Sequence, residues 1–159
     1  MKGSPKIITL LNHLLAGELT AIDQYFIHSR MYQDWGLTRL YNRIAHEMQD
    51  ETEHADQMIK RILFLQGMPD LSQREPLNVG HNVVDMLKND LALEYAVVKN
   101  LRDGIALCEQ ENDFETRNML QQQLEDTELD HTHWLEQQLG LIEKVGLENY
   151  LQAMTLAEA

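Results

Sequence analysis

The stretch from His46 to His54 places carboxylates and imidazoles at the spacing of one helix face. Residues three or four apart in a helix share a face, so Glu47, Glu51 and His54 are predicted to project together. His46 and Asp50 fall on the adjoining strip. Apolar residues before and after this stretch lie on the same stripe as Glu51 and His54, where a helix contributes to a core. A buried carboxylate costs several kcal/mol unless it is paired or bound to a metal, so a compensating partner is expected.

The same pattern recurs in the other half of the chain. In each half a lone Glu interrupts an apolar helical stripe, and the Glu of a Glu-x-x-His motif follows 33 positions later in the first half and 34 in the second. A single Glu-x-x-His motif arises readily by chance, but this doubled placement on inward stripes does not. The six residues are Glu18, Glu51 and His54 in the first half, and Glu94, Glu128 and His131 in the second.

Four carboxylates and two imidazoles in a helical core predict a site for two divalent or trivalent metal ions, whose charge neutralises the carboxylates. Oxygen-rich ligands with one imidazole per metal favour iron or manganese. A Glu from each of two helices and a Glu-x-x-His motif from each of two others is the ligand pattern of ferritin-like di-iron proteins. The alternative, an interhelical ion-pair network, needs more cations than these stripes contain.

Helices must position these residues. Long runs rich in Leu, Glu, Gln and Ala, with few Gly and Pro, indicate an all-α chain. Apolar residues recur at three- and four-residue intervals in four long segments, which indicates a four-helix bundle. The connection of about 15 residues between the second and third segments is long enough to cross the length of a bundle. The first two predicted helices run from Ser4-Pro5 to about Asp34 and from about Thr38 to Leu65. The third begins near Asn82, has an apolar stripe that reaches Cys108, and precedes a turn at Asn112-Asp113. The fourth runs from about Phe114 to Lys144, and a short fifth helix runs from Leu147 to about Met154.

Length, net charge and cysteine content indicate the number of domains, the kind of partner and the cellular compartment. A chain of 159 residues suits a single domain spanning residues 1–159. The net charge of −13 argues against nucleic acid as a partner and favours attraction of cations. The single cysteine, Cys108, excludes an intramolecular disulfide and fits a reducing compartment. No segment resembles a signal peptide or an apolar membrane span, so a cytoplasmic protein that does not contact a membrane is expected.

Several segments together resemble bacterioferritin. They are residues 17–19 (GEL), 21–26 (AIDQYF), 35–37 (WGL), 50–51 (DE) with 54–56 (HAD), 90–94 (DLALE) and 146–151 (GLENYL). The resemblance covers essentially the whole chain. It implies a ferritin-like four-helix bundle with a long crossover between its second and third helices and a short fifth helix. It also implies a 24-subunit shell that stores ferric mineral, and a ferroxidase centre in each subunit that oxidises Fe²⁺ with O₂ or hydrogen peroxide.

The resemblance also assigns roles to individual residues. By similarity, Glu18 and His54 hold one iron, Glu94 and His131 hold the other, and Glu51 and Glu128 bridge the two. Tyr25, two turns beyond Glu18, is expected to hydrogen-bond to the centre or to supply an electron, although an ordinary core tyrosine is the competing interpretation. His46 and Asp50 match residues that bind an iron on the inner wall of the shell. His13, His28, His81 and His133 are expected to be surface or interface residues.

One position departs from the family. Bacterioferritins bind haem between two subunits through a methionine at the position of Thr52, and a threonine hydroxyl is a poor ligand for haem iron. Met48, one turn earlier, lies about 6 Å along the helix axis from the expected sulfur position. Haem b is therefore not expected in a shell of this chain alone. Partners implied are copies of this chain, a haem-binding bacterioferritin subunit in a mixed shell, and a ferredoxin-type electron donor for iron release.

Two other functions remain open. The same ligand set serves di-iron enzymes that oxidise organic substrates or reduce peroxide without storing mineral. Such enzymes typically need a substrate pocket or an added electron-transfer module, and the chain has no Cys-x-x-Cys pair to hold a rubredoxin-type iron. A structural subunit with an idle centre is the third interpretation, which the complete ligand set disfavours.

Overall fold

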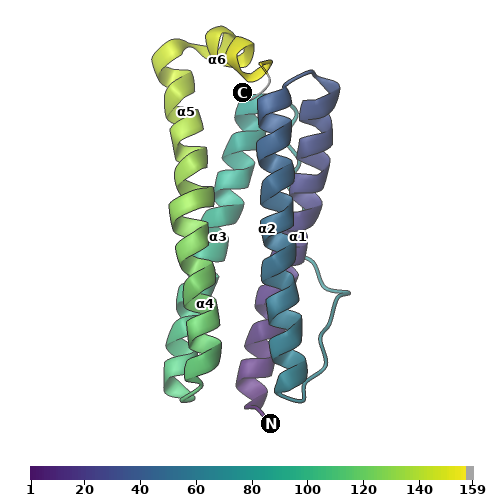
Figure 1. The fold of residues 1–159 in the computed structure, drawn as a ribbon, viewed down its shortest axis with the longest axis vertical. Coiled ribbons are helices and arrows are strands. Elements are labelled where there is room, and N and C mark those ends of the chain that lie inside the picture. Colours follow the sequence, from purple (N-terminus) through teal and green to yellow (C-terminus); the bar gives the residue numbers. More distant parts are fainter. Residues whose placement is uncertain (157–159) are drawn as a thin grey trace.

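A computed structural model describes residues 1–156, and every regular element in that part of the chain is helical. Four long helical columns stand side by side and a short helix lies across one end (Figure 1). This architecture confirms the all-α four-helix bundle with a short C-terminal helix. The elements are α1 (Pro5–Asp34), α2 (Thr38–Phe64), α3 (Val83–Gln110), α4 (Phe114–Asp126), η1 (Thr127–Thr132), α5 (His133–Val145) and α6 (Leu147–Met154).

Local sequence signals set most helix ends. The side chain of Ser4 accepts a hydrogen bond from the backbone N–H of Lys6 at the start of α1. Asn82 caps α3 and Asp113 caps α4 in the same way. Gly146 has a φ of 83° between α5 and α6, a backbone conformation that favours glycine. These signals explain why the predicted helix boundaries agree closely with the structure.

Antiparallel α1 and α2 form one hairpin, and α3 forms the second with the continuous column of α4, η1 and α5 (Figure 1). The connection between α2 and α3 runs along the outside of the bundle beside α1 and returns the chain to the end where α3 begins. The predicted crossover is thus present. None of the helices within residues 1–156 combines the length and apolar character needed to span a membrane.

Polar side chains of α1 hold this crossover in place. Four of them, spaced by multiples of four residues, accept hydrogen bonds from crossover backbone N–H groups. His28 is one of them and also contacts the carboxylate of Asp90 at 2.8 Å, with both side chains fully buried. The prediction that His28 lies at the surface or an interface is wrong, because the crossover covers it. The donor and acceptor pairs are Asp70 with Asn12, Glu75 with Thr20, Asn78 with Gln24, and Gly80 with His28.

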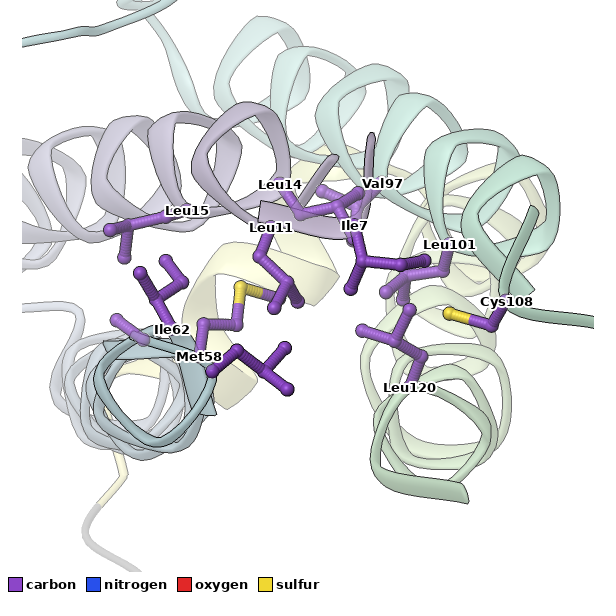
Figure 2. Packing of buried hydrophobic residues seen from close by; sticks show 12 residues of the cluster. Ile7, Leu11, Leu14, Leu15, Met58, Ile62, Val97, Leu101, Cys108 and Leu120 are labelled. Atoms are coloured by element: carbon purple, nitrogen blue, oxygen red, sulfur yellow. The ribbon is translucent and has the colours of Figure 1, made fainter. Parts of the chain in front are cut away.

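Two hydrophobic clusters fill the bundle, one toward each end. In the first, side chains from α1, α2, α3 and α4 point toward one another, among them Leu11, Met58, Leu101 and Leu120 (Figure 2). The second contains Tyr25, Leu40, Leu87 and Leu135 and extends to α6. Buried polar side chains lie between the clusters and belong to the candidate site.

The short helix α6 is packed more closely than the sequence predicts. The sequence predicts an apolar face of Leu147, Tyr150, Leu151 and Met154 on this helix, with little to bury against in one subunit. Instead Tyr150 is only 2% exposed and donates a hydrogen bond from its hydroxyl to Gln138 of α5. Leu151 and Met154 also pack against the second cluster, and Leu147 is 41% exposed. The expectation was wrong for Tyr150 because α5 and the bundle end provide a pocket for its ring.

Candidate metal centre

Five of the six predicted ligands meet in the middle of the bundle. Each helical column contributes, and all five side chains are at least nine-tenths buried. They reach the centre because each occupies an inward position on an otherwise apolar stripe. The five are Glu18 of α1, Glu51 and His54 of α2, Glu94 of α3 and His131 of η1.

Glu51 lies between the two imidazoles. Its Oε2 is 3.4 Å from Nδ1 of His54, and its Oε1 is 2.8 Å from Nδ1 of His131. Glu18 Oε2 is 3.9 Å from the same nitrogen of His54, and Glu94 Oε1 is 3.4 Å from that of His131. The centroids of the His54 and His131 rings are 6.2 Å apart. The atoms therefore form two three-residue groups that share Glu51.

Many of the converging atoms lack a hydrogen bond. Buried polar atoms are nearly always satisfied, and each exception costs about 1–3 kcal/mol. Six of the thirteen unsatisfied buried side-chain atoms in the described part of the chain lie at this point, and all six are potential metal ligands. The residues present therefore fit two metal ions that share a carboxylate. These atoms are Oε2 of Glu18, both Oε atoms of Glu51, Oε2 of Glu94, and Nδ1 of His54 and of His131.

In the metal-free protein, protons replace part of the missing positive charge. Burial and the charge of Glu51 raise the pKa of Glu18 well above its usual range. Burial, with the Glu51 charge second, raises the pKa of Glu94 to about 7. Burial opposes ionisation of Glu51, but its close contacts with Glu18 and the two histidines hold its pKa well below the usual range. Burial would lower the pKa of His54, yet Glu51 outweighs it and raises that pKa.

Tyr25 lies directly against this site. Its hydroxyl donates a hydrogen bond to Oε1 of Glu94, and its side chain is 1% exposed. Burial, followed by the Glu94 charge, raises the pKa of the phenol well above its usual value. Tyr25 is therefore a neutral hydrogen-bond donor to a candidate ligand at physiological pH.

Glu128 does not join the other five residues. Its side chain is 37% exposed and forms an ion pair with Arg102 of α3. The expectation that all six residues face inward is thus not met in this structure. Glu128 and His131 both lie in η1, where the backbone is π-helical. Hydrogen bonds in a π-helix join residues five apart, so each turn holds more residues and positions three apart no longer share a face.

The π-helical segment accounts for the spacing difference between the two halves. The second half has 34 positions where the first has 33, and a π-helical turn accommodates an extra residue within an otherwise regular helix. His131 keeps its inward direction and α5 continues the apolar stripe with Leu135. Glu128, near the start of the segment, is turned toward α3.

A third group of side chains lies on the outer side of His131. Its Nε2 is 2.6 Å from Oε2 of Glu47 and 3.4 Å from Oδ2 of Asp50. Arg43 forms ion pairs with Glu47 and with Asp130. The sequence placed Glu47 on the inward face, but Asp130 was missed because its direction depends on the π-helical turn.

His46 and Asp50, the predicted iron-binding residues on the inner wall of the shell, lie one helical turn apart and make a long contact. The distance from Nε2 of His46 to Oδ2 of Asp50 is 3.5 Å, and the His46 side chain is 59% exposed. Hydrogen bonding with His131 is the largest factor that lowers the pKa of Asp50. Asp50 therefore faces the buried histidine as well as the exposed one.

Three further residues, Asp126, Thr52 and Met48, lie on or beside the helices that carry the centre. Asp126, the last residue of α4, places Oδ2 at 2.9 Å from Nε2 of His54, a contact that the sequence analysis missed. The exposed Thr52 donates a hydrogen bond from its hydroxyl to the carbonyl of Met48. Met48 packs against the second hydrophobic cluster.

An all-α bundle with one crossover connection and carboxylates and imidazoles gathered at its centre defines the class of ferritin-like helical bundles. Comparison with known proteins agrees. The model of the ferritin-like domain matches residues 8–145. The chain therefore belongs to the ferritin-like family.

Similar proteins span almost the same length. The chain is 61% identical to a bacterial ferritin of Synechocystis, over 96% of this chain and 98% of that protein. It is 56% identical to a bacterial ferritin of Pseudomonas aeruginosa, over 96% and 99% of the two chains. It is 40% identical to a bacterioferritin of Mycolicibacterium paratuberculosis, over 94% of each. The similarity thus includes all the helices that build the site.

Proposed function

We propose that this protein stores iron and oxidises Fe²⁺ to Fe³⁺ at a di-iron centre within each subunit. The observation that carries the proposal is Glu51, whose two unpartnered oxygens each face an imidazole nitrogen without a partner. The names of the relatives, bacterial ferritin and bacterioferritin, support the same function.

The proposed ligands are the six residues predicted from the sequence. Glu18 and His54 would hold one iron, Glu94 and His131 the other, and Glu51 would bridge them. Glu128 would become the second bridge only by leaving Arg102 and turning inward. Loss of the ion pair itself costs little, because exposed ion pairs contribute only about 0–1 kcal/mol. His46 and Asp50 remain the proposed iron site on the inner wall.

The chain's own residues prepare the oxidation. Glu18 and Glu94, whose pKa values are raised, release their protons when Fe²⁺ binds as substrate. Two Fe²⁺ ions give up one electron each, and one hydrogen peroxide with two protons accepts both electrons to give two water molecules. O₂ is the alternative oxidant and yields hydrogen peroxide from the same two electrons and two protons. Tyr25 holds Glu94 in place through its hydroxyl and is positioned to supply a further electron.

The proposal includes an assembly. We expect residues 1–159 to form one ferritin-like domain that assembles into a cytoplasmic 24-subunit shell around ferric mineral. The shell would contain this chain alone or with a haem-binding bacterioferritin subunit. A ferredoxin-type donor would reduce the mineral for release, and neither nucleic acid nor a membrane is an expected partner.

The test is a double substitution, Glu51→Ala with His54→Ala, in the full-length protein. Rapid mixing of Fe²⁺ with air-saturated protein should show a fast phase of oxidation in the wild type and none in the variant. A matched control, Glu53→Ala with His81→Ala, removes the same residue types from exposed positions and should keep the fast phase. Equal rates in the wild type and the Glu51/His54 variant would place the oxidation elsewhere. Elution of the assembled protein near half a megadalton, with iron retained, tests the shell.

A further inference from the structure

Each buried imidazole of the centre turns one nitrogen inward and the other toward a carboxylate. For His54, Nδ1 faces Glu18 and Glu51, while Nε2 is 2.9 Å from Oδ2 of Asp126. Asp126 belongs to α4, whereas His54 belongs to α2, so the contact joins the two hairpins. For His131, Nε2 faces Glu47 of the opposite hairpin in the corresponding way.

The outer contact decides which nitrogen can bind a metal. A neutral imidazole carries one N–H and one lone pair, and only the lone pair is a ligand. A carboxylate that accepts the N–H from Nε2 leaves the lone pair on Nδ1. Histidine ligands of metals commonly have such an outer hydrogen-bond acceptor, and its removal typically weakens metal binding by about 10- to 100-fold.

We propose that Asp126 is a positioning residue of the metal centre, which holds the proton of His54 on Nε2 and presents Nδ1 to the ion shared with Glu18 and Glu51. This role rests on the proposed function. Asp126 suits it because, in the part of the chain that the structure describes, its one ion-pair partner is His54. Glu47, the counterpart beside His131, also binds Arg43, so its carboxylate is shared with a largely buried ion pair.

The test measures binding of Co²⁺, a divalent probe that the centre does not oxidise under nitrogen. The full-length protein is first stripped with a chelator, and its visible absorption is then followed during titration. Wild type should bind one ion at each of the two three-residue groups. Asp126→Ala should weaken one of the two by about 10- to 100-fold and leave the other unchanged. Asp126→Asn keeps an acceptor oxygen and should recover most of that affinity.

A second readout follows the proton itself. At a pH where the His54 imidazole is neutral, nitrogen-15 NMR of histidine-labelled, metal-free protein should show its proton on Nε2 in the wild type and a mixture of both tautomers in Asp126→Ala. The signal is assigned with a His54→Gln variant. The control is Asp56→Ala, which removes an equal charge from an exposed ion pair with Lys60 on the same helix as His54 and should change neither readout.

Three outcomes would overturn the role of Asp126. The first is an Asp126→Ala variant that binds Co²⁺ as tightly as the wild type. The second is a variant in which both Co²⁺ affinities fall equally and the unfolding temperature of the metal-free protein is lower. The third is an equal loss of Co²⁺ affinity in Asp126→Ala and Asp126→Asn. A different result separates the proposed function from this inference. If the wild type and the Glu51→Ala variant bind the same amount of Co²⁺, Glu51 is not part of a metal site and the metal centre itself is refuted.

Discussion

Glu94→Gln should stabilise the metal-free protein and weaken the metal-bound one. Glu94 is fully buried, and its pKa is raised from 4.5 to about 7, first by burial and then by the charge of Glu51. Glutamine has nearly the same shape and keeps an oxygen that accepts the hydrogen bond from the Tyr25 hydroxyl. The substitution therefore removes the ionisation and little else.

The size of the effect follows from the difference between the two pKa values. Below pH 4.5 the carboxyl is protonated in both the folded and the unfolded protein, so ionisation contributes nothing to stability. Between pH 4.5 and about 7 the unfolded chain loses the proton while the folded protein keeps it, and the folded state loses stability as pH rises. At about 1.4 kcal/mol per pH unit, the wild type has lost about 3 kcal/mol at pH 8. Glu94→Gln should therefore be more stable by about that amount at pH 8, and by less than about 1 kcal/mol at pH 5.

Thermal unfolding of chelator-treated protein at the two pH values measures this difference. For a chain of this size, about 3 kcal/mol corresponds to a rise of roughly 6–12 °C in Tm at pH 8. Addition of Co²⁺ should reverse the order, because the variant lacks a ligand and gains less from the metal. Glu53→Gln, at an exposed position of α2, is the control and should leave Tm unchanged at both pH values. A metal-free Glu94→Gln protein less stable than wild type at pH 8 would refute the argument that the carboxylates are crowded.

Three other predictions concern the edges of the site and the assembly. Arg102→Ala removes the ion-pair partner of Glu128 and should tighten Co²⁺ binding by up to about fivefold in a titration, since an exposed ion pair contributes about 1 kcal/mol at most. Weaker Co²⁺ binding in this variant would contradict a ligand role for Glu128. Deletion of the chain after Gly146 should lower Tm and alter the shell in size-exclusion chromatography, and Tyr150→Ala alone should cost about 3–5 kcal/mol; an unchanged shell of unchanged Tm would exclude a role for α6. The protein expressed alone in haem-sufficient cells should show no Soret band, and Thr52→Met should produce one; a band in the wild type that Met48→Leu removes would identify Met48 as the haem ligand.

Sequence periodicity was sufficient for the helices and for most of the central residues. The bounds of α1, α2 and α6 follow from caps, glycines and apolar spacing, all of which act within a few residues of the chain. The inward direction of Glu18, Glu51 and Glu94 follows from the same spacing, because a residue on an apolar stripe must face the core whatever its charge. The prediction of the four-helix bundle and its crossover is confirmed for this reason.

Contacts between distant residues could not be predicted in this way. His28 contacts Asp90, 62 positions away, and His54 contacts Asp126, 72 positions away. Whether such a histidine is exposed or buried depends on which element covers it, and here the crossover and α4 do so. Tyr150 is buried for the same kind of reason, because α6 folds back onto the end of the bundle.

The sequence by itself determined that Glu18, Glu51 and Glu94 face the core, because helical periodicity directs a side chain from its position in the chain alone. Only the tertiary structure decided that Glu128 pairs with Arg102, that Asp126 and Glu47 approach the histidines, and that Asp130 pairs with Arg43. For Glu128 and Asp130 the physical reason is the π-helical turn at residues 127–132, which changes the angle between successive side chains where η1 passes the centre. Apolar spacing does not reveal such a backbone change, because the spacing on either side of it remains that of an ordinary helix.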